Sequence, residues 1–209
     1  MTESTVDDLY LLERNRLIQE LSAATRTDWE QQSLCAGWTI RDLAAHLLMP
    51  FELTLPGVLR RMVTARFDFD RLADRWARAD RRTGSEITAA LSVTTAEAFN
   101  VLGADERAPL SHLVIHAQDV RVPLGLAGSC GPEAGRLVLT GLTAGRHSVG
   151  PHLLTGLRLR ATDADWSLGD GPVVEGRASA LISALAGRAA SAAALAGDGA
   201  PELRRRLSI

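Results

Sequence analysis

Lysine is absent from this chain of 209 residues, and all 23 basic residues are arginine. The absence excludes a lysine Schiff base and the lysine of a phosphate-binding P-loop. Positive charge is not in excess either, because the formal net charge is -2. Binding to the phosphates of nucleic acids needs a basic surface, so we expect no nucleic-acid partner.

Cysteines and long apolar runs are equally scarce. The two cysteines, Cys35 and Cys130, are too few for a disulfide framework, which indicates a reducing compartment. No run reaches the roughly 20 consecutive apolar residues of a membrane span, and the acidic N-terminus lacks the basic and apolar regions of a signal peptide. We therefore expect a cytoplasmic protein with no membrane partner.

Apolar residues make up 46% of the chain, which is enough to bury a core. Residues 66–83 are rich in Asp and Arg, which is typical of a solvated connection or an exposed short helix. Thr39, with Asp42 three residues later, predicts the start of a helix that Pro50 kinks or ends. Apolar spacing predicts further helices over residues 4–25, 85–102, 107–125 and 132–147.

The sequence pattern changes after Gly150. Alternation over residues 157–161, then glycine-rich turns and a second apolar pair, predicts a small hairpin or meander. An alanine-rich helix over 177–195 and a short one near 201–207 follow. We therefore expect a mainly α fold, with a helical bundle over residues 1–150 and a small α/β domain over residues 151–209.

Three of the five histidines occupy positions that suit a metal site. His112 and His116 are four residues apart, so both imidazoles lie on one face of their helix and can share a cation. His46 flanks the apolar stripe of an earlier helix and supplies a third ligand from within the bundle. The alternative is a pair of partly exposed helix histidines. Asp119 either orients an imidazole or forms an ion pair on the helix surface.

The remaining reactive side chains give weaker signals. His147 and His152 flank the domain junction and are interpreted as a helix C-terminal cation and a loop residue. Cys35 stands at the start of a helix and is interpreted as a small buried residue, because no partner that lowers its pKa is evident. The chain has no GxSxG, CxxC or dinucleotide-binding glycine pattern.

Three segments resemble one family. LCAGWTIRDLAAH (residues 34–46) and SHLVIHAQDVRVPLG (111–125) resemble two signatures of the mycothiol-dependent maleylpyruvate isomerase family, within the DinB-like superfamily. ATDADWSLGDGPVVEG (161–176), LAGR (185–188) and AGDG (196–199) resemble its C-terminal domain. The resemblance covers most of the chain in the right order.

The resemblance implies a DinB-like four-helix bundle that holds a divalent metal through His46, His112 and His116. Zinc is the usual ion, and nickel or iron also suits imidazole ligands. Family members commonly carry glutamate where His112 stands, and the three-histidine set resembles other DinB-like proteins. A neutral third ligand leaves the ion with more net positive charge, which favours anions or an ionised thiol.

The resemblance also implies a mechanism and partners. Mycothiol, or another low-molecular-weight thiol, attacks a small electrophilic substrate as the thiolate, in an isomerisation or a transfer. Arg188 is a candidate catalytic residue that holds a carboxylate, and the alternative is a helix arginine that reaches into water. A homodimer is one state that short bundles adopt through an exposed helix face.

Two other functions fit the same residues. A hydrolase would keep the metal and use an activated water in place of the thiol. A metal-binding or metal-stabilised helical module would have no catalytic activity.

Overall fold

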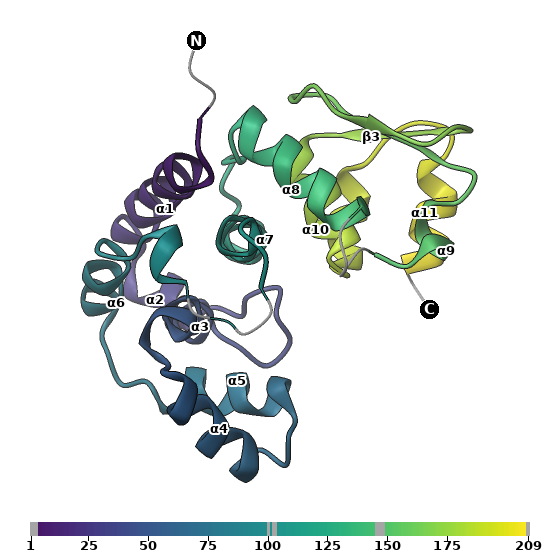
Figure 1. Ribbon diagram of the computed structural model, residues 1–209. Coiled ribbons are helices and arrows are strands. Elements are labelled where there is room, and N and C mark those ends of the chain that lie inside the picture. The colour runs from purple at the N-terminus through teal and green to yellow at the C-terminus, as the bar shows by residue number, and fades with distance from the viewer. Residues whose placement is uncertain (1–3, 100, 102–103, 145–148, 208–209) are drawn as a thin grey trace. The chain divides into compact units, whose positions relative to one another are not determined.

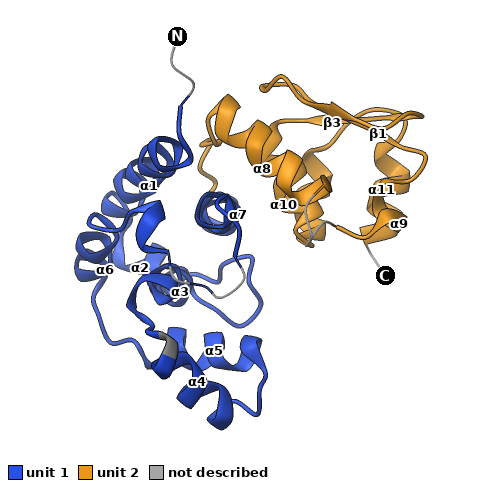
Figure 2. Cartoon of the chain, viewed as in Figure 1, with its two compact units in different colours: residues 1–124 blue, residues 125–209 orange. Residues whose placement is uncertain are grey.

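Helices dominate the computed structural model, which describes residues 4–99, 101, 104–144 and 149–207 (Figure 1). The chain divides into two compact units, Met1–Leu124 and Gly125–Ile209 (Figure 2). None of the described helices is long and apolar enough to cross a membrane.

The first unit is built around four helices. Both α1 (Val6–Ser22) and α3 (Ile40–Glu52) pack against α6 (Gly84–Leu91) and α7 (Ala108–Arg121), which closes a four-helix bundle (Figure 1). Their facing side chains form one buried apolar core. Shorter elements complete the unit: α2 (Arg26–Glu30), α4 (Leu55–Thr64), α5 (Phe69–Ala79) and the 3-10 helix η1 (Ala96–Ala98).

The start of α3 follows the predicted capping pattern. The Thr39 hydroxyl accepts from the Asp42 N–H, and the Asp42 carboxylate accepts from the Thr39 N–H in return. These bonds satisfy amide groups that the first helical turn leaves unpaired. Pro50 does not end the helix at once, because it lies in the last turn and α3 continues to Glu52.

Two predicted segments can be compared with the structure. Residues 66–83 contain α5, which agrees with the short helix that was one of two interpretations, and Leu72, Ala73 and Ala77 bury one face of it. The helix predicted over 85–102 ends at Leu91, where the Thr94 hydroxyl donates to the Leu91 carbonyl and competes with helix continuation. Residues 100 and 102 of that prediction lie outside the described residues.

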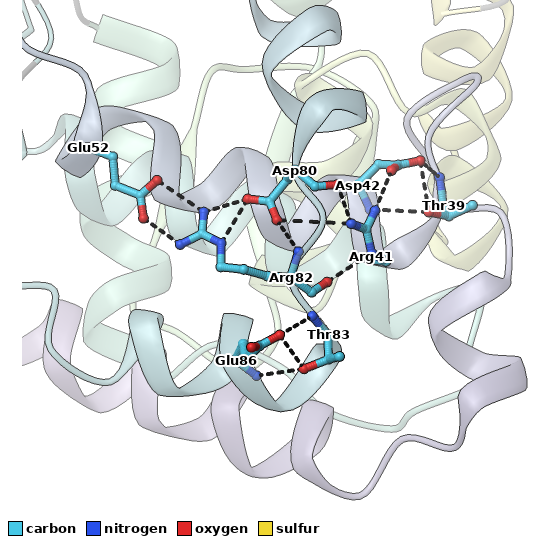
Figure 3. A network of polar contacts seen from close by, with 8 residues as sticks. All are labelled: Thr39, Arg41, Asp42, Glu52, Asp80, Arg82, Thr83 and Glu86. Carbon is cyan, nitrogen blue, oxygen red and sulfur yellow. Dashed lines mark hydrogen bonds and ion pairs between the residues drawn. The ribbon is translucent and has the colours of Figure 1, made fainter.

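A polar network holds α3 at both ends (Figure 3). Near its N-terminus, Arg41 donates to the backbone carbonyls of Asp80 and Arg82. At its C-terminus, Glu52 accepts two bonds from the Arg82 guanidinium, at 2.6 and 3.0 Å. Arg82 also pairs with the carboxylate of Asp80. The segment between α5 and α6 therefore restrains the helix that carries His46.

The second unit contains a small sheet with strand order β2-β1-β3. β1 (Arg158–Ala161) pairs with β2 (Ser167–Leu168) in antiparallel fashion and with β3 (Val173–Gly176) in parallel fashion. The two predicted strand segments, residues 157–161 and the pair at 173–174, therefore lie side by side in parallel and do not form a hairpin. The antiparallel partner of β1 is β2, which lies in the segment that was predicted as turns. The helical elements are α8 (Pro132–Ala144), α9 (Pro151–Leu154), α10 (Ala178–Leu185), η2 (Ala189–Ala194) and α11 (Ala200–Leu207).

Helix packing in the second unit explains two further differences. α8 packs against α10, so the division between compact units falls before α8 and not at the expected boundary after residue 150. The single helix predicted over 177–195 is two elements, because Gly187 adopts a left-handed φ of 88° between them. The predicted fold class, mainly α with a helical bundle and a small α/β part, is confirmed.

Candidate metal centre

Two neighbouring helices of the bundle bring three histidines together. His46 lies on α3, and His112 and His116 lie one turn apart on α7. One ring nitrogen from each of the three lies within 4.8 Å of the others. The Nε2 atoms of His46 and His112 are 3.2 Å apart. The structure therefore groups the three histidines that the sequence analysis selected.

Burial keeps two of these imidazoles neutral. It lowers the pKa of His46 to about 3, and the nearby His116 contributes to the same shift. Burial also lowers the pKa of His112 well below its usual range, helped by His116 and His46. Neutral imidazole is the form that binds metals, so these rings can offer lone pairs across the physiological pH range.

The residues present fit a divalent ion. Three imidazoles from two helices form a donor set that suits zinc, nickel or iron. Nδ1 of His46 is buried and makes no hydrogen bond to any described residue. That incomplete hydrogen bonding is unusual for a buried polar ring that has a purely structural role.

Asp119 and Cys35 adjoin the histidines. Asp119 Oδ2 lies 2.9 Å from Nδ1 of His116 and 3.2 Å from Sγ of Cys35. Two roles were predicted for Asp119: orienting an imidazole, or forming an ion pair on the helix surface. Asp119 is fully buried, which excludes the surface ion pair. The contact with Cys35 was not expected from the sequence. It depends on the fold of the loop between α2 and α3, for which the sequence carries no signal.

A cavity of about 400 Å³ opens beside the histidines. The Trp38 ring forms part of its wall, with its centroid 4.8 Å from that of His46. The Trp38 indole N–H donates to Asp74 at 3.0 Å, and Arg78 holds the same carboxylate. The cavity is lined by Cys35, Ala36, Trp38, His46, Phe69, Asp70, Ala73, Asp74 and His116.

The other candidate residues lie elsewhere. Arg188 is in the second unit, half-buried before η2, and its guanidinium donates to the Ala186 carbonyl. His152 lies on α9 of the same unit, and His147 lies outside the described residues. The prediction that Arg188 holds a carboxylate of a reactant therefore stays a prediction.

Comparison with known proteins gives one family match. A family model described as "Mycothiol maleylpyruvate isomerase N-terminal domain" matches residues 10–121. Among curated protein sequences, none matches this chain.

Two solved structures are similar over nearly the whole chain. A crystal structure of a histidine-to-alanine mutant of the mycothiol-dependent maleylpyruvate isomerase shares 15% identity, with a TM-score of 0.52. The match covers 95% of this chain and 97% of that one. A second crystal structure of the mycothiol-dependent maleylpyruvate isomerase shares 16% identity with a TM-score of 0.48, over 95% of this chain and 97% of that one. At these identities the first match supports the fold alone, and the family match agrees with the resemblance that the sequence motifs carry.

Proposed function

Because the chain belongs to the mycothiol maleylpyruvate isomerase N-terminal domain family, we propose that it is a metal-dependent enzyme that uses a mycothiol-type thiol. It would act on a small electrophilic substrate as an isomerase or a transferase. The observation that carries this proposal is the cluster of three histidines beside a cavity of about 400 Å³.

The proposed metal ligands are His46, His112 and His116. Zinc is the first candidate, and nickel or iron suits the same donor set. When bound, the ion supplies the positive charge that lowers the pKa of a coordinated thiol, so that thiolate is available near neutral pH.

The surrounding residues shape the space for the reactants. Burial holds His46 neutral, and Trp38 packs against its ring and closes one side of the cavity. Asp74 and Arg78 fix the orientation of the Trp38 indole through the shared carboxylate. We propose that Arg188, in the second unit, holds a carboxylate of the substrate or the thiol.

The thiol chemistry proceeds by addition and elimination. The cofactor sulfur adds to one carbon of a cis double bond, and the electron pair moves onto the conjugated carbonyl. Rotation about the resulting single bond and expulsion of the sulfur then give the trans isomer and return the thiol. With an alkyl or epoxide carbon, the sulfur would instead displace the leaving group and give a transferase.

Location and assembly are the remaining parts of the proposal. We propose the reducing cytoplasm as the location, because two cysteines are too few for a disulfide framework. A homodimer stays a prediction, which sedimentation of the purified chain would test.

Elemental mass spectrometry of the purified, untagged protein tests the metal site. We expect about one zinc or similar ion per chain, lost in the double variant His112→Ala/His116→Ala. The Asp74→Asn variant is the matched control, because Asp74 lines the same cavity but makes its hydrogen bonds with Trp38 and Arg78. A wild-type protein that stays empty after incubation with zinc would refute the metal site.

Thiol binding tests the use of the cofactor. We expect His46→Ala to lose both metal and thiol binding, whereas His152→Ala, at an exposed histidine on α9 of the second unit, keeps both. Thiol binding that survives in His46→Ala would refute activation of the thiol at this site. Turnover without any added thiol would favour the hydrolase, and metal binding without turnover of any substrate would favour the non-catalytic module.

A further inference from the structure

The carboxylate of Asp119 is the buried acidic group closest to the histidine cluster. The side chain is fully buried on α7, three residues after His116 and therefore on the same helix face. Its Oδ2 atom lies 2.9 Å from Nδ1 of His116, which is a normal hydrogen-bond distance.

Asp119 also connects the loop that forms one wall of the cavity to α7 by hydrogen bonds. Its Oδ2 atom accepts from the Cys35 thiol at 3.2 Å, and its backbone carbonyl accepts from the Leu34 N–H at 3.1 Å. The loop between α2 and α3 is thus attached through both the main chain and the side chain of one residue. That loop contributes Cys35, Ala36 and Trp38 to the cavity.

The chemistry of these contacts determines where the protons lie. With Asp119 as an ionised carboxylate, which can only accept, the bond needs the proton of His116 on Nδ1. The lone pair of a neutral ring is then on Nε2. The Cys35 sulfur, for the same reason, engages Asp119 as a protonated thiol.

We propose that Asp119 is a positioning residue, which holds His116 as the Nδ1–H tautomer so that Nε2 is offered to an ion shared with His46 and His112. Cys35 is a second donor to the same carboxylate and not a metal ligand. The role toward the ion rests on the proposed function, whereas the tautomer of His116 is a property of the metal-free chain.

The competing arrangement uses the same atoms differently. Donor atoms of Cys35, His116 and Asp119 also lie within 4.8 Å of one another and form a second group that could hold an ion. In the structure, however, both short contacts converge on a single carboxylate oxygen, at 2.9 and 3.2 Å. That convergence is the pattern of two donors around one acceptor, which favours the positioning role.

Nitrogen NMR of the histidine rings in the metal-free protein tests the tautomer. We expect His116 to be the Nδ1–H form in the wild type and in the Asp74→Asn control. Asp119→Ala should lose that preference, and Asp119→Asn, which keeps an acceptor oxygen, should retain part of it. If Asp119→Ala does not fold, Asp119→Asn still decides the question. A His116 ring that has the same tautomer in every folded Asp119 variant would overturn the proposal.

Zinc and cobalt binding test the consequence for the metal. We expect the zinc Kd of Asp119→Ala to rise about 10–100-fold, with a smaller rise for Asp119→Asn and one ion per chain at saturation in both. Cobalt-loaded wild type should show no thiolate-to-cobalt charge-transfer band and should match Cys35→Ser. A band that disappears in Cys35→Ser would overturn the proposal in favour of the competing ligand set.

The two proposals fail in different ways. A wild-type chain that binds no metal would remove the proposed function, while the metal-free tautomer would still decide the role of Asp119. Tight metal binding that is unchanged in both Asp119 variants would leave the proposed function intact and overturn the positioning role.

Discussion

Tyr10 is the only tyrosine of the chain, and the fold shifts its titration. Its ring is buried on α1, and its hydroxyl is 2.7 Å from Oγ1 of Thr94. Burial raises the pKa of Tyr10 to about 12 from its ordinary value of 10.0, although the hydrogen bond with Thr94 opposes the shift. The absence of lysine removes the side chain that usually titrates in the same range.

The raised pKa predicts a loss of stability at high pH. Below about pH 10 the tyrosine is protonated in both states, so its contribution to the free energy of unfolding is fully present. Between pH 10 and 12 only the unfolded state ionises, and that contribution falls as the pH rises. Tyrosinate absorbance, measured in the native protein and in denaturant, should give midpoints about two pH units apart. Tyr10→Phe should remove this part of the pH dependence, and coincident midpoints would contradict the prediction.

Arg188 allows a test of the second unit's contribution to catalysis. Replacing it by glutamine removes a charged donor, so the KM for a carboxylate-bearing reactant should rise about tenfold or more. Metal content should not change, because none of the proposed ligands lies in residues 125–209. Arg158→Gln, an exposed arginine of the same unit, is the matched control. Equal kinetics for the two variants would mean that Arg188 does not hold a carboxylate of a reactant.

At the scale of elements, the network around Arg82 should control the stability of α3. Arg82→Ala removes both hydrogen bonds to Glu52. It also removes the ion pair with the mostly buried Asp80, so that Arg41 is the arginine of the network that still pairs with this carboxylate. We expect the free energy of unfolding to fall by about 1–3 kcal/mol, measured by denaturant titration. The control is Arg26→Ala, whose ion pair with Glu30 is largely exposed and should contribute little. Equal losses of stability in the two variants would contradict the prediction that the network around Arg82 stabilises α3.

The elements also show what the sequence can and cannot predict. The start of α3 and the histidine pair on α7 follow from local rules, namely a Thr-Asp capping pattern and a spacing of four residues. The many charges of residues 66–83 left a connection and a short helix equally open, and the helix forms because Leu72, Ala73 and Ala77 give it a buried face. The role of Cys35 was missed because its contact with Asp119 joins positions 84 residues apart. A single sequence gives no periodicity that reports such long-range contacts.

At the scale of the whole molecule, the two compact units predict a regional response to metal. All three proposed ligands lie in residues 1–124, so zinc should stabilise that unit directly. A ligand that binds only the folded state adds about 4 kcal/mol at a free concentration of 1,000 times its Kd. The sheet of the second unit contains none of these ligands, so the free energy of its local unfolding should change much less.

Hydrogen exchange of the intact chain, followed by mass spectrometry, measures this difference. Zinc should slow exchange in peptides from α3 and α7, because opening either helix separates His46 from His112 and His116. Peptides that contain β1 and β3 should exchange at nearly the same rate with and without zinc. The variant His112→Ala/His116→Ala should show no zinc effect in any peptide. Equal protection across both units would mean that they open together, so that the division after Leu124 would describe packing but not cooperativity.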